Sequence, residues 1–76
     1  MARVAIVTGG TRGIGAAIAT MLKAGGYKVA ATYAGNDAAA EAFFRKTDIA
    51  VYKFDVSDFD ACKRGVAKIT ADLGPV

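Results

Sequence analysis

The stretch VTGGTRGIG, residues 7–15, places four glycines within nine residues near the start of the chain. It follows RVAIV, residues 3–7, a short run rich in β-branched residues that predicts a buried strand. It leads into residues 13–24, where the apolar spacing predicts a helix with one face formed by Ile14, Ile18, Met21 and Leu22. Glycine loses the most backbone freedom on folding, so four glycines at one strand-to-helix turn indicate a specific requirement.

The alternation of strand and helix continues along the chain. Residues 27–33 predict a second strand, and Asp37 is the expected N-cap of a helix over residues 38–46. Residues 49–54 predict a third strand, and Ser57 is the expected N-cap of a last helix whose inward residues are Phe59, Cys62, Val66, Ile69 and Leu73. Strands that alternate with helix-length crossovers predict an α/β fold, a parallel sheet covered by helices.

Composition limits the classes of function that the chain can have. Its 76 residues include 10 Lys and Arg against 7 Asp and Glu, and the basic residues are scattered rather than gathered in a stripe. Nucleic-acid binding is therefore not expected, and no apolar run approaches the roughly 20 residues of a membrane helix. The single cysteine, Cys62, fits a cytoplasmic protein. The absence of histidine argues against histidine-based catalysis and most zinc sites, and we expect no bound metal.

The glycine cluster lies between a strand and a helix, where a doubly wound fold binds phosphate. A helix N-terminus offers unpaired N–H groups, and glycines let phosphate oxygens approach the backbone. A P-loop requires Lys and then Ser or Thr after its last glycine, but Ala16 and Ala17 follow Gly15, which argues against an NTPase. The G-x-G-x-x-G fingerprint is also absent. The remaining pattern is T-G-x-x-x-G-x-G, formed by Thr8, Gly9, Gly13 and Gly15.

This pattern, placed after an N-terminal strand, resembles the short-chain dehydrogenase/reductase family. The resemblance covers all 76 residues and implies the N-terminal portion of one Rossmann-type doubly wound domain, in the order β-α-β-α-β-α. It also implies that a nicotinamide dinucleotide lies along the glycine-rich turn and the ends of the second and third strands. The expected cofactor-binding residues are Gly9, Thr11, Arg12, Gly13, Ile14, Gly15, Tyr33, Asn36, Asp55 and Val56.

Two residues in this set favour NADPH over NADH. NAD-preferring members place an acidic residue at the tip of the second strand, where it binds the ribose 2′-hydroxyl, but that position is the uncharged Tyr33. Arg12 lies directly before Gly13, where NADP-preferring members often carry a basic residue that reaches the 2′-phosphate. Asp37, 22 residues after Gly15, is the alternative ribose ligand, and that role would favour NAD. A helix cap is the other interpretation of Asp37.

The sequence FDVSD, residues 54–58, follows the third predicted strand. The family commonly has an Asp here whose side chain meets the adenine amino group, with the next residue's backbone alongside. Asp55 and Val56 match these two positions, so the resemblance assigns them to the adenine.

The family's catalytic residues have no counterpart in this chain. No Tyr-x-x-x-Lys pair is present, because the residues four places after the three tyrosines are Ala31, Asp37 and Val56. We therefore expect the catalytic residues beyond Val76, and residues 1–76 to be a domain portion truncated before the fourth strand. Without that strand, residues 3–7 become a sheet edge with unpaired backbone groups.

Within the family, the segments at residues 3–19, 26–37 and 51–58 look most similar to the bacterial acetoacetyl-CoA reductases of polyhydroxybutyrate synthesis. That resemblance implies NADPH-dependent reduction of the acyl-CoA thioester acetoacetyl-CoA to (R)-3-hydroxybutyryl-CoA by a protein that forms a homotetramer. The 3-oxoacyl-acyl-carrier-protein reductases of fatty-acid synthesis share the same N-terminal pattern and are the alternative. A nucleotide-binding module without catalysis is a third interpretation.

Overall fold

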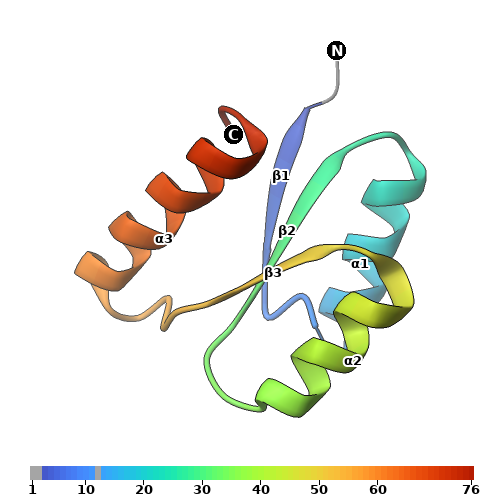
Figure 1. The fold of residues 1–76 in the computed structure, drawn as a ribbon, viewed down its shortest axis with the longest axis horizontal. Coiled ribbons are helices and arrows are strands. Elements are labelled where there is room, and N and C mark those ends of the chain that lie inside the picture. Colours follow the sequence, from blue (N-terminus) through green and yellow to red (C-terminus); the bar gives the residue numbers. More distant parts are fainter. Residues whose placement is uncertain (1–2, 12) are drawn as a thin grey trace.

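A computed structural model describes residues 3–11 and 13–76 and shows strands and helices in strict alternation (Figure 1). The sequence predicted this order of six elements, and the order is confirmed. Each predicted strand begins one residue before the observed strand. The elements are β1 (Val4–Thr8), α1 (Gly13–Ala24), β2 (Lys28–Tyr33), α2 (Asp37–Thr47), β3 (Ala50–Lys53) and α3 (Phe59–Leu73).

The three strands form one parallel sheet in the order β1-β2-β3. Val4 of β1 pairs with Lys28 of β2, and Tyr33 at the end of β2 pairs with Lys53 at the end of β3. Each crossover contains a helix, as parallel pairing requires. The predicted α/β class is confirmed, and the carboxyl ends of all three strands lie at the same edge of the sheet.

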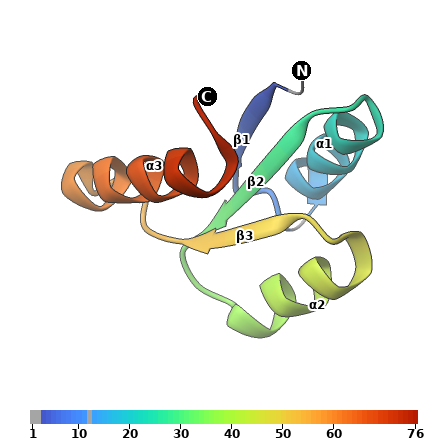
Figure 2. The same cartoon turned by 45° about the horizontal axis from the view of Figure 1, so that its top comes forward.

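Helices α1 and α2 cover one face of the sheet, and α3 covers the other (Figures 1 and 2). The side chains of β2 therefore alternate between two apolar clusters. Val29 and Ala31 belong to the cluster shared with α1 and α2, whereas Ala30 belongs to the cluster shared with α3. Four consecutive residues of β2 are buried, Val29 to Thr32, as expected for a parallel strand covered on both faces.

Helices α1 and α3 each bury a narrower strip of their surface than their apolar residues suggest. On α1 the small side chain of Ala19 is fully buried, while Ile14 and Met21 are 81% and 73% exposed. On α3, Ile69 is buried, but Phe59 is 77% exposed, so the prediction that Phe59 points inward is wrong. Val66 is also exposed, which corrects the prediction for that residue too. The reason is geometric, because a sheet of three strands offers each helix only a narrow surface to cover.

The N-cap of α2 lies one residue earlier than the sequence predicted. The side-chain Oδ1 of Asn36 accepts a hydrogen bond from the backbone N–H of Ala39 at 3.0 Å, which makes Asn36 the cap. Asp37, the predicted cap, is instead the first residue of the helix, where a carboxylate suits the positive end of the helix dipole.

The burial difference between two helical isoleucines predicts different costs of truncation. Ile69→Ala removes a fully buried side chain of α3 and should lower the free energy of unfolding by about 2–5 kcal/mol. Ile18→Ala makes the same chemical change on an exposed position of α1 and should cost less than about 1 kcal/mol. Urea unfolding followed by circular dichroism measures both. Equal losses would contradict the packing of α3 on the sheet.

Candidate functional site

The glycine-rich turn leaves the carboxyl end of β1 and enters α1. Gly9 and Gly13 have φ angles of 65° and 55°, a region that side-chain-bearing residues adopt only with strain. A Cβ placed on either of them would meet no atom within 4 Å. Their α-carbons therefore face open space, so a ligand can approach the backbone closely at these two residues.

The other two glycines are required by close packing within the protein. A Cβ on Gly15 would collide with the carbonyl oxygen of Gly9 and lie 2.9 Å from its carbonyl carbon. A Cβ on Gly10 would lie 2.8 Å from the carbonyl oxygen of Val7 and 2.9 Å from the Cβ of Ala31. Gly15 thus lets the first turn of α1 lie directly against the turn that follows β1, and Gly10 lets that turn lie against β1 and β2.

This arrangement presents the N-terminus of α1 at the carboxyl edge of the sheet. The first turn of the helix contains no acidic residue, so its unpaired N–H groups and partial positive charge are not opposed by a carboxylate there. With the open faces of Gly9 and Gly13 beside it, the turn fits an anionic group such as the pyrophosphate of a dinucleotide.

The other predicted cofactor residues that the structure describes lie at the same edge. Tyr33 is the half-buried last residue of β2, and Asn36 caps α2 directly after it. Asp55 and Val56 are exposed and follow the end of β3. Arg12 is the residue that lies outside the described part of the chain. Within the glycine-rich turn, Thr11 is buried and Ile14 is exposed.

Asp55 forms a tight turn with Ser57 rather than a free carboxylate. Its Oδ1 accepts hydrogen bonds from the hydroxyl of Ser57 at 2.7 Å and from the Ser57 backbone N–H at 2.9 Å. These bonds, led by that of the hydroxyl, lower the pKa of Asp55 below its ordinary value of 3.8. Ser57 was predicted as the N-cap of α3, and this is wrong. Asp58 is the cap, accepting from the N–H of Ala61 at 3.1 Å.

An ion pair that the sequence did not reveal lies between the ends of β2 and β3. The ammonium of Lys53 lies 3.1 Å from Oδ1 of Asp37. The two residues are 16 positions apart in the chain, and they meet because Lys53 ends the strand beside β2 and Asp37 begins the helix after β2. Only the pairing of β2 with β3 could have indicated this contact.

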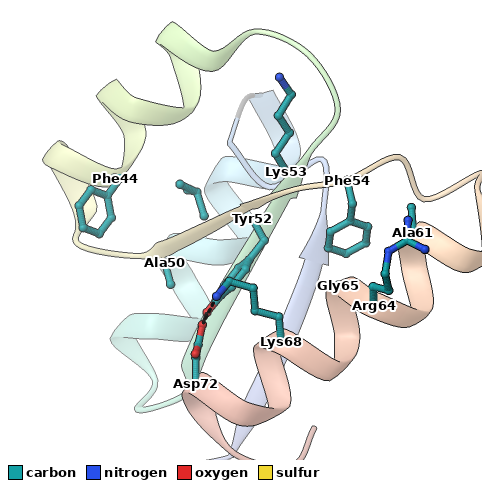
Figure 3. A pocket seen from close by; sticks show the side chains of 11 residues that line it. Phe44, Ala50, Tyr52, Lys53, Phe54, Ala61, Arg64, Gly65, Lys68 and Asp72 are labelled. Atoms are coloured by element: carbon teal, nitrogen blue, oxygen red, sulfur yellow. Dashed lines mark hydrogen bonds and ion pairs between the residues drawn. The ribbon is translucent and has the colours of Figure 1, made fainter.

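A separate groove of about 770 Å³ lies between β3 and α3 (Figure 3). The ring of Phe54 packs against Gly65 of α3, where a Cβ would overlap it. The hydroxyl of Tyr52 donates to Oδ2 of Asp72 at 2.9 Å, and burial together with this carboxylate raises the pKa of Tyr52 to about 12. The groove is lined by none of the predicted cofactor residues; its lining is Phe44, Ala50, Val51, Tyr52, Lys53, Phe54, Ala61, Arg64, Gly65, Lys68 and Asp72.

Two further classes of site are absent from residues 3–11 and 13–76. In that part of the chain, no three His, Cys, Asp or Glu residues gather in a way that could hold a metal ion. None of the helices described there is long and apolar enough to cross a membrane.

The sequence of the chain, including its glycine-rich turn, matches a known protein family. A sequence model described as short chain dehydrogenase matches residues 3–76. The chain belongs to the short-chain dehydrogenase family. Membership in this family of oxidoreductases agrees with the parallel sheet and with the placement of the glycine-rich turn between β1 and α1.

Relatives within the family match the chain along its whole length. It is 67% identical over 76 residues to an acetoacetyl-CoA reductase of Shinella zoogloeoides and 64% identical over 76 residues to that of Rhizobium meliloti (strain 1021). It is 41% identical to the 3-oxoacyl-[acyl-carrier-protein] reductase MabA of Mycobacterium tuberculosis (strain ATCC 25618 / H37Rv). The matches include 100% of this chain, 32% of either acetoacetyl-CoA reductase and 28% of MabA, so the chain spans about a third of the length of these relatives.

Solved structures share the fold of the chain. A blue fluorescent protein from a metagenomic library, in complex with NADPH, superimposes with a TM-score of 0.89 and 34% sequence identity over 97% of this chain and 33% of that one. BdcA in complex with NADPH superimposes with a TM-score of 0.79 and 36% identity over 87% of this chain and 27% of that one. The predicted Rossmann-type arrangement is thereby confirmed.

The close packing of Gly15 predicts a large effect of a single methyl group. Gly15→Ala should push α1 away from the carbonyl of Gly9 and lower the free energy of unfolding by about 1–3 kcal/mol. Gly35→Ala is the matched control, because a Cβ there meets nothing within 4 Å and its φ is ordinary. Chemical denaturation compares the two variants, and an equal effect of both would contradict the close approach of α1 to the turn.

The turn at Asp55 predicts a pH dependence with a defined sign. Because the folded state favours the ionised carboxyl, its contribution to stability is present above pH 3.8 and is lost as the pH falls through the lowered pKa. Ser57→Ala removes the hydroxyl donor, so the pKa of Asp55 should rise toward 3.8, measured by NMR titration of the carboxyl resonance. Thr70→Ala, which removes a hydroxyl from α3 that bonds to the carbonyl of Val66, should leave that pKa unchanged. An unchanged pKa in Ser57→Ala would contradict this assignment.

Proposed function

We propose that residues 1–76 are the cofactor-binding N-terminal portion of an NADPH-dependent acetoacetyl-CoA reductase. The whole protein would reduce acetoacetyl-CoA to (R)-3-hydroxybutyryl-CoA for polyhydroxybutyrate synthesis in the cytoplasm, as a homotetramer. The observation that carries the proposal is the similarity to acetoacetyl-CoA reductases along all 76 residues, which is greater than the similarity to MabA. The catalytic residues would lie in the part of the protein that follows Val76.

The described residues have separate tasks in holding the dinucleotide. The backbone N–H groups around Gly9, Gly13 and Gly15 would bind the pyrophosphate at the N-terminus of α1. The other carboxylate oxygen of Asp55, Oδ2, would accept from the adenine amino group, while Oδ1 stays bound to Ser57 and fixes the side chain. When bound, NADPH supplies the hydride that reduces the ketone.

Two features support NADPH over NADH. Tyr33 places no negative charge at the tip of β2, so it offers no repulsion to a 2′-phosphate. Arg12 would supply a guanidinium to that phosphate, because its forked donors match phosphate oxygens.

The second candidate is a 3-oxoacyl-acyl-carrier-protein reductase, which the similarity to MabA favours. The two candidates differ in the carrier of the thioester and share the cofactor. A nucleotide-binding module without catalysis is the third.

A substrate comparison with the complete protein tests the assignment. We expect spectrophotometric NADPH oxidation with acetoacetyl-CoA and little with the acetoacetyl thioester of acyl carrier protein. The reverse preference would move the assignment to the second candidate. Binding of NADPH without oxidation of either thioester would support the non-catalytic module.

Removal of Arg12 tests the cofactor preference separately. Arg12→Ala should raise the Kd for NADPH about tenfold, the loss of roughly one charge-assisted hydrogen-bonded contact, and should change the Kd for NADH much less. Arg64→Ala removes the same charge from α3 and serves as the control. Equal losses for NADPH and NADH in Arg12→Ala would remove Arg12 from the 2′-phosphate site.

A further inference from the structure

The ion pair of Lys53 and Asp37 occupies the part of the sheet edge where a dinucleotide's ribose would be recognised. Lys53 ends β3 and pairs in register with Tyr33, the residue at the tip of β2. Asp37 lies four residues after Tyr33, at the start of α2. Figure 3 shows the Lys53 side chain extending away from α3, and its ammonium reaches both carboxylate oxygens of Asp37, at 3.1 Å and 3.3 Å.

A free carboxylate at this position would bind the wrong cofactor for the proposed function. An acidic residue about 20 positions beyond the glycine motif accepts a hydrogen bond from the ribose 2′-hydroxyl of NAD, and Asp37 stands 22 positions after Gly15. The same carboxylate would repel the 2′-phosphate of NADPH. The ammonium of Lys53 offsets this charge and lies within reach of both carboxylate oxygens.

The pair has little to do with holding the fold together. The side chains of Lys53 and Asp37 are 53% and 68% exposed, and ion pairs this accessible to water contribute little to folding stability. Asn36, not Asp37, supplies the side-chain cap of α2, so the start of the helix does not rest on the Asp37 carboxylate alone. Substitutions in the pair can therefore be read as changes in local charge.

We propose that Lys53 is a specificity-determining residue for the cofactor, which acts by holding the carboxylate of Asp37. With Lys53 in place, the edge between β2 and β3 tolerates a 2′-phosphate. Without it, Asp37 is free to accept from a 2′-hydroxyl and to repel a phosphate. This inference rests on the proposed preference for NADPH, and it names a residue that acts beyond the glycine-rich turn and Arg12.

The test uses adenosine fragments, because they report on this half of the dinucleotide without any reaction. Isothermal titration calorimetry of the complete protein would compare 2′,5′-ADP with 5′-ADP at low ionic strength, where charge effects are least screened. In Lys53→Met the Kd for 2′,5′-ADP should rise about three- to tenfold, while that for 5′-ADP stays equal or falls. Circular dichroism of each variant would check that the fold is retained.

A second substitution separates action through Asp37 from direct contact with the phosphate. The double variant Asp37→Asn with Lys53→Met carries neither charge, and it should recover the wild-type preference for 2′,5′-ADP to within about twofold. If the double variant binds 2′,5′-ADP as weakly as Lys53→Met alone, Lys53 does not act through Asp37 and the proposal is overturned.

The matched control is another exposed lysine–aspartate pair of the chain. Lys68→Met breaks the pair of Lys68 with Asp72 on α3, at 3.7 Å, and should leave both dissociation constants unchanged. An equal rise for Lys68→Met would mean that only net charge matters and would overturn the proposal. A wild-type protein without preference for 2′,5′-ADP would overturn the NADPH assignment and this inference together. A wild-type preference that Lys53→Met leaves intact would overturn this inference alone.

Discussion

The packing of β2 between two neighbouring strands and two helical layers is the constraint that places the rest of the structure. Its residues from Val29 to Thr32 are all buried, and they alternate between the cluster under α1 and α2 and the cluster under α3. Ala30 and Ala31 have small side chains, which let both layers approach closely. Because β1 and β3 pair with β2 in parallel, three strand ends and their connections converge on one edge.

The glycine-rich turn is joined to this strand by direct contact. Gly10 leaves no room for a Cβ against Ala31 of β2, and Gly15 leaves none against the carbonyl of Gly9. Two glycines thus draw the turn and the first turn of α1 onto the sheet, while Gly9 and Gly13 keep the outer side of the turn free of side chains. Gly10 and Gly15 are therefore needed for packing inside the protein, and Gly9 and Gly13 leave the backbone accessible on the outside. These two needs explain why four glycines lie so close together.

The sequence predicted what depends on local pattern and missed what depends on contacts between distant segments. The order of elements and the position of the glycine-rich turn follow from apolar spacing and from glycine placement. The caps were displaced by one residue, because Asn36 and Asp37, like Ser57 and Asp58, are adjacent residues that can each cap a helix. Which of the two forms the hydrogen bond depends on the backbone conformation of the connection before the helix, and apolar spacing does not fix that conformation.

The carboxylates at the proposed binding edge affect both the local structure of turns and helix starts and the charge that a dinucleotide would meet. Asp37 is held by Lys53, Asp55 by Ser57 and Asp58 by the backbone of Ala61, so each acidic group has a partner within the protein. Helix starts favour acidic residues, yet an edge that receives an anionic dinucleotide is opposed by free negative charge. At Asp37 the ammonium of Lys53 offsets the negative charge, whereas the donors to Asp55 and Asp58 are neutral and fix the orientation of those carboxylates in a turn and at a helix start without offsetting their charge.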